Sequence, residues 1–98
     1  MTLTDATVKI KGMAVGNEGK VNAKINFQFP EGTIHLDDTV SPTSISNENK
    51  EADCTIKMSL DNYGKMLDGK LNPMMAFMAG KMKIEGDKGV AMKLASLF

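Results

Sequence analysis

Hydrophobic and polar residues alternate most regularly between Lys20 and Phe29, where five apolar side chains are interleaved with five polar ones. A period of two over ten residues predicts a β-strand with one buried face and one solvent-exposed face. The turn sequence Pro30 to Gly32 follows, and beyond it Ile34 and Leu36 repeat the alternation. The two segments therefore predict a β-hairpin.

Three further segments have the pattern of strands. They lie around Thr43 to Ser46, from Asp53 to Ser59 and from Lys81 to Glu85. In the second segment Cys54, Ile56 and Met58 share one face, and in the third Met82 and Ile84 share one face. We expect these side chains to point into the core.

Helical patterns favour four helices. Near the N-terminus, Thr2 and Asp5 are spaced like a capping box, although the same segment also alternates like a strand; we favour a short helix. A second helix is expected to end at Gly69, a typical C-terminal cap. Asn72 followed by Pro73 is a strong signal for the start of a third.

The segment from Asn72 to Phe98 holds five of the nine methionines of the chain. Its last helix is expected to follow Asp87, and its apolar residues surround most of the helix, which indicates deep burial or contact with other apolar material. Methionine is flexible and polarizable. These residues therefore either fill the core or line a pocket that adapts to its ligand.

Strands come first and helices cluster later, which predicts an α+β fold with a largely antiparallel sheet covered by helices on one face. A length of 98 residues predicts one domain, 1–98. Twelve lysines balance twelve acidic residues, and the chain has no arginine, so nucleic acid is not an expected partner. The N-terminus lacks the apolar segment of a signal peptide, and we expect a cytoplasmic protein.

Motifs for catalysis and metal binding are incomplete. The sequence GKMLDGK from Gly64 to Lys70 matches seven positions of a phosphate-binding loop, but Leu71 replaces the Ser or Thr that would bind Mg²⁺. His35 alternates outward on its strand and is expected at the surface. Cys54 is expected to be a buried thiol, and the acidic residues lack the spacing of a calcium loop. We therefore expect no enzyme activity, cofactor or metal.

Three motifs in the second half of the chain carry a family resemblance. They are ADCTI from Ala52 to Ile56, GKLNP..AF..GK.KI.G from Gly69 to Gly86, and G.AMKL..LF from Gly89 to Phe98. In this order and spacing they resemble the sterol carrier protein type-2 domain, the non-specific lipid-transfer family, in its bacterial branch. The resemblance covers about half of the chain.

The resemblance implies a five-stranded sheet with helices on one face and an apolar tunnel between them. It implies intracellular binding and carriage of fatty acids, acyl-CoA, phospholipids or sterols by a domain that is not an enzyme. Carried over residue by residue, the tunnel would be lined by three groups. The sheet wall would be Ile25, Phe27, Leu36 and Ile56, the opposite side Phe77, Met78, Met82 and Ile84, and the mouth Met92, Leu94 and Phe98.

The chain departs from the family pattern in its short N-terminal helical segment and in the few residues that follow the last helix. These differences favour an acyl chain, either as fatty acid or as acyl-CoA, over a sterol. They also leave two arrangements open, a monomer with a more exposed tunnel mouth or a weak homodimer that covers the mouth. Lys88 and Lys93 could guide a transient contact with anionic membranes. The alternative is a non-enzymatic accessory module of the same fold whose methionine-rich face is a protein interface.

Overall fold

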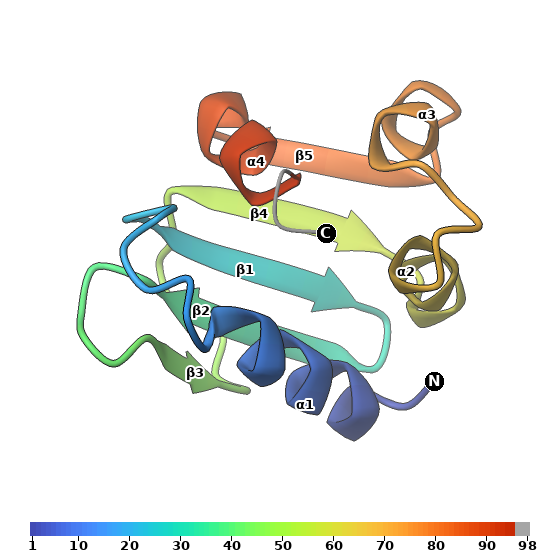
Figure 1. The fold of residues 1–98 in the computed structure, drawn as a ribbon. Helices are drawn as coiled ribbons and strands as arrows, with labels where there is room; N and C mark the ends of the chain where they lie inside the picture. The colour runs from blue at the N-terminus through green and yellow to red at the C-terminus, as the bar shows by residue number, and fades with distance from the viewer. Residues whose placement is uncertain (96–98) are drawn as a thin grey trace.

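The structure is a computed structural model that describes residues 1–95. Its sheet contains β1 (Lys24–Phe29), β2 (Gly32–Asp37), β3 (Ser44–Ser46), β4 (Cys54–Met58) and β5 (Met82–Gly86). Its helices are α1 (Leu3–Ala14), α2 (Leu60–Leu67), α3 (Pro73–Met78) and α4 (Lys88–Ala95). The helices lie on one side of the sheet (Figure 1), which confirms the predicted α+β class.

The strands follow the order β3-β2-β1-β4-β5. Three of the four neighbouring pairs are antiparallel, and β1 pairs with β4 in parallel, so the sheet is mixed. The parallel pair arises because the connection from β3 returns across the sheet before β4 begins. The Asn26 side chain marks this crossing, since its Nδ2 donates to the carbonyl of Lys50 at 2.6 Å. The connection covers the face of the sheet that is turned away from the helices.

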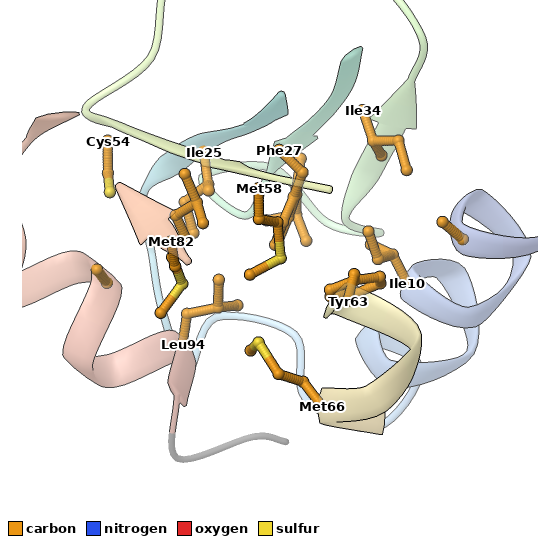
Figure 2. Packing of buried hydrophobic residues seen from close by; sticks show 14 of the residues in the cluster. Ile10, Ile25, Phe27, Ile34, Cys54, Met58, Tyr63, Met66, Met82 and Leu94 are labelled. Carbon is orange, nitrogen blue, oxygen red and sulfur yellow. The ribbon is translucent and has the colours of Figure 1, made fainter. Parts of the chain in front are cut away.

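The hydrophobic core lies between the sheet and the helices. Figure 2 shows side chains from β1, β4, β5, α2 and α4 pointing into this layer. Tyr63 of α2 is fully buried against two aromatic rings of β1, with ring centroids 6.1 Å from Phe27 and 5.5 Å from Phe29. Tilted aromatic pairs of this kind each contribute about 0.5–1.5 kcal/mol beyond their burial. They attach α2 to the end of β1.

The predicted caps are present. Thr2 and Asp5 form the capping box of α1, and the Asn72 side chain accepts hydrogen bonds from backbone amides of α3. Gly69 has the left-handed φ of 75° that follows a helix end. These caps are local interactions, which is why the residue pattern was sufficient to predict them.

The first strand is shorter than the predicted strand at 20–29, because β1 begins only at Lys24. Val21 and Ala23 are still buried, but the backbone before Lys24 is irregular and Asn22 has a φ of 50°. The cause is Asp38, whose buried carboxylate accepts hydrogen bonds from the backbone amides of Gly19, Val21 and Asn22. These amides are therefore not available for a sheet ladder.

The prediction that His35 lies at the surface is wrong. Its side chain is buried, and so is that of Asn26, which was expected on the solvent-exposed face of its strand. Both side chains do point away from the helices, as the alternation predicted. The connection between β3 and β4 covers them there, and such a long-range crossing leaves no periodic signal.

The last helix is amphipathic in its described part, so of the two expected alternatives, deep burial of the whole helix does not hold. Val90, Ala91 and Leu94 are buried, whereas Met92 is 67% exposed. Leu97 and Phe98 lie outside the described residues. The exposed methionine of α4 therefore needs a different explanation from core packing.

Candidate functional site

An apolar cavity of ≈180 Å³ lies between the edge of the sheet and three helices. It is lined by Ile56, Met82 and Ile84 of the sheet, Met66 of α2, Pro73, Met74 and Phe77 of α3, and Lys88, Ala91 and Met92 of α4. A dry apolar cavity of about 150 Å³ is large enough to bind benzene. This cavity can therefore hold a short stretch of hydrocarbon.

The sheet wall of the cavity follows from the register of β4 and β5. Ile56 is directly opposite Ile84, and Met58 is directly opposite Met82, so these side chains share the face that the helices cover. Ile84 is only partly buried. The edge strand thus presents apolar surface that the helices do not fully cover.

The sharp turn after β5 places α4 over this wall. Gly86 has a φ of 88°, and a Cβ atom at this position would collide with the carbonyl oxygen of Asp53. The next residue, Asp87, donates its backbone amide to the same carbonyl at 2.8 Å. Its side chain then accepts from the amides of Gly89 and Val90 at the start of α4. Only glycine allows this close approach and this backbone conformation.

Two smaller voids lie deeper in the core. The first, of ≈10 Å³, shares Ile56, Met66 and Met82 with the cavity and reaches Phe27. The second, of ≈20 Å³, also borders Phe27 and is lined by Leu36 and Leu94 as well. Figure 2 shows the side chains of Met66 and Met82 pointing into the interior from opposite elements. Because both methionines line the cavity and the first void, rotation of these flexible side chains would join these two spaces.

The mouth of the cavity is apolar and open to solvent. Met74 is 58% exposed and Met92 is 67% exposed. The Lys88 ammonium lies 5.9 Å from the centroid of the Phe77 ring, in a cation–π contact between α4 and α3. Within the described part of the chain, Lys88 is the only charged residue that lines the cavity.

The predicted tunnel residues divide into three groups. Ile56, Phe77, Met82, Ile84 and Met92 line the cavity together. Ile25, Phe27, Leu36 and Leu94 are buried deeper, and the last three border the small voids. Met78 is 79% exposed and does not border the cavity, and Phe98 lies outside the described residues.

The position of Met78 has a geometric reason. Pro73, Met74 and Phe77 occupy one side of the short helix α3 at positions i, i+1 and i+4, and this side faces the cavity. Around the helix axis these three residues span an arc of about 100°, and Met78 lies about 40° beyond Met74, outside that arc. The same spacing could have identified Pro73 and Met74 from the sequence. Met66, Lys88 and Ala91 reach the cavity only through tertiary packing.

Apart from Lys88, no nucleophilic or titratable side chain of residues 1–95 lines this cavity. Cys54 is buried, and burial together with Asp87 and Asp53 raises the pKa of its thiol, so the neutral form is favoured. His35 lies on the opposite face of the sheet. Residues 1–95 contain no cluster of three or more His, Cys, Asp or Glu side chains that could hold a metal ion. No helix among these residues is both long and apolar enough to cross a bilayer.

A mixed five-stranded sheet with helices on one face and an apolar cavity beneath them defines the structural class of this chain. The sequence profile of the SCP-2 sterol transfer family matches residues 8–98. The chain therefore belongs to the SCP-2 sterol transfer family. This assignment confirms the resemblance seen in the motifs of the second half of the chain.

Individual relatives agree with this assignment. The chain is 47% identical over 53 residues to sterol carrier protein 2 of Homo sapiens, which covers 54% of the chain and 10% of that protein. It is 51% identical over 47 residues to hydroxysteroid dehydrogenase-like protein 2 of Bos taurus. This match covers 48% of the chain and 11% of that protein. The chain thus spans about a tenth of the length of these relatives.

Among solved structures, the sterol carrier protein domain 2 of Helicoverpa armigera superposes with a TM-score of 0.75 at 28% identity. The match covers 92% of this chain and 82% of that one. The chain therefore shares the fold of this sterol carrier protein domain.

Proposed function

We propose that this chain binds single-chain acyl lipids, as fatty acid or acyl-CoA, in the cavity between β4, β5, α3 and α4 and carries them without chemical change. The observation that supports the proposal is the cavity itself, which is almost wholly apolar and has an open apolar mouth. Membership of the SCP-2 sterol transfer family supports a lipid as the ligand.

The size of the cavity favours a flexible chain over a sterol. A volume of ≈180 Å³ suits a short stretch of hydrocarbon, whereas the rigid ring system of a sterol cannot be taken up in parts. Each buried methylene contributes about 0.8 kcal/mol, so about six methylenes contribute ~5 kcal/mol. Before the entropic cost of ordering the bound chain is subtracted, this free energy corresponds to a sub-millimolar dissociation constant. A longer chain gains further binding free energy only if Met66 and Met82 move and open the cavity into the smaller void that they also line.

The charge distribution supports delivery at an anionic membrane surface. Residues 69–98 contain five lysines and two acidic residues, whereas residues 1–68 contain seven lysines and ten acidic residues. The positive part of the chain includes α3 and α4, which carry the exposed methionines of the cavity mouth. A transient contact through this region would place the mouth against the lipid, and salt would weaken it.

A chain-length series tests the proposal. Delipidated protein is titrated with saturated fatty acids of 6 to 16 carbons and with cholesterol, and binding is followed by calorimetry. We expect affinity to rise with each methylene up to the length that fills the cavity, and cholesterol to bind more weakly than the long acids. Absence of binding across the whole series would overturn the proposal. An oligomer that is insensitive to fatty acid in size-exclusion chromatography would instead support the interaction module.

A further inference from the structure

We propose that Lys88 selects ligands with an anionic headgroup and recognises the carboxylate of a fatty acid at the mouth of the cavity. This inference rests on the proposed function, because it assigns the headgroup position for a chain bound in that cavity. Lys88 is exposed at the first position of α4, and its side chain lines the cavity wall.

The position of the Lys88 side chain suits this role. Its aliphatic part borders the cavity, while its ammonium lies at the rim, 5.9 Å from the centroid of the Phe77 ring. This arrangement keeps the charge near water and the hydrocarbon part against the apolar wall. Because the rest of the lining is uncharged and apolar, the ammonium is the only cationic group of the described lining that a headgroup can meet.

The Lys88 ammonium has no carboxylate of residues 1–95 within ion-pair distance. The two nearest acidic residues in sequence are engaged elsewhere. Asp87 accepts hydrogen bonds from the amides of Gly89 and Val90, and Glu85 pairs with Lys57 at 2.9 Å. An external carboxylate would therefore meet an ammonium that is not already neutralised by a described partner.

The apolar lining sets the orientation of the ligand. A carboxylate placed inside would lose its hydration without gaining a hydrogen-bond partner, which is strongly unfavourable. The hydrocarbon tail therefore enters and the carboxylate stays at the rim beside Lys88. A single ammonium on a chain without arginine suits a singly charged carboxylate better than a phosphate that needs several donors.

The test compares dodecanoate with dodecanol, which has the same chain and no charge, at pH 8 by calorimetry. The variant is Lys88→Met, which keeps an unbranched apolar side chain, and the control is Lys83→Met on the outer face of β5. We expect Lys88→Met to weaken dodecanoate binding about fivefold, the size of one charge pair at an exposed rim, and to leave dodecanol unchanged. Lys83→Met should change neither affinity, and Lys88→Arg should retain the preference for the acid.

The outcomes separate this inference from the proposed function. An equal loss of acid and alcohol binding in Lys88→Met, or an unchanged acid-to-alcohol ratio, would overturn the role of Lys88 while binding to the cavity stands. If the wild-type chain binds neither ligand, the proposed function fails together with the inference. Thermal unfolding of each variant checks that the fold is retained, which is expected because both lysines are exposed.

Discussion

Asn26 and His35 stand directly opposite each other on β1 and β2, with His35 Nδ1 2.6 Å from Asn26 Oδ1. Asn26 Nδ2 donates to the Lys50 carbonyl, so its Oδ1 accepts and His35 Nδ1 is the donor. This bond links the sheet to the connection that crosses it. The neutral histidine, with its proton on Nδ1, is the form that this buried site holds.

The first prediction concerns pH. Burial lowers the pKa of His35, and Lys50 lowers it further, more than Asp37 raises it. The unfolded chain binds the proton with a pKa of about 6.5, so protonation favours unfolding. The contribution of His35 to stability is therefore complete above about pH 6.5 and is lost as the pH falls toward the lowered folded pKa. We expect the free energy of unfolding in urea to decrease from pH 7.5 to pH 5.5.

His35→Gln should remove most of this slope, because the chain has no other histidine. The midpoint of urea unfolding, measured at several pH values for both proteins, provides the comparison. A variant with the same slope as the wild type would show that another group titrates.

The second prediction concerns Asp38. Burial raises the pKa of this carboxyl, but hydrogen bonds from Asn22, Gly19, Thr43 and Val21 outweigh it and hold the pKa below its ordinary value. Asp38→Ala leaves those donors without their acceptor, and we expect a loss of about 2–4 kcal/mol in the free energy of unfolding, measured in guanidinium chloride.

Asp37→Ala is the matched control. Asp37 is adjacent, but the hydrogen bonds its carboxylate accepts come only from Thr39 within residues 1–95. Its removal should change the free energy of unfolding by less than about 1 kcal/mol. Equal effects of the two substitutions would argue against the role of Asp38 in ordering residues 19–22.

The third prediction concerns Gly86. Gly86→Ala combines a left-handed φ of 88° with a collision against the Asp53 carbonyl, whereas Gly80→Ala has a φ of 75° and open space around its Cβ. We expect thermal unfolding to show a cost of about 1 kcal/mol for Gly80→Ala and at least twice that for Gly86→Ala. A difference near zero would mean that the chain around Asp53 adjusts freely.

The fourth prediction concerns the volume of the cavity. Ala91 is buried on α4 and lines the cavity, so Ala91→Leu places additional apolar atoms inside it. We expect stability to stay the same or rise, and the affinity for dodecanoate to fall about tenfold or more, because the methylene sites are occupied. Chemical unfolding and calorimetry on the same samples measure both effects.

Ala79→Leu adds the same group at an exposed position after α3 and serves as the control. It should leave the affinity for dodecanoate unchanged. Retention of full affinity in Ala91→Leu would mean that the ligand lies elsewhere.

Several features were predictable because their causes are local. Ile34 and Leu36 alternate with polar residues, and this pattern predicts the side of the strand on which they lie, since successive side chains of a strand point to opposite faces. The signals at Asn72, Pro73 and Gly69 act within one helical turn of the ends they mark. The order of strands and helices and the motifs of the second half of the chain were therefore sufficient for the fold class and the family.

By itself, the sequence determined where the strands and helices lie, apart from residues 20–23, and which face of each strand points toward the core. The tertiary structure decided which of those side chains surround empty space. Met66 and Ala91 reach the cavity, and His35 is buried, because segments distant in sequence pack over them. The period of apolar residues along the sequence determines the direction of a side chain only relative to its own backbone. The cavity depends on the fit between elements, and no single element contains that information.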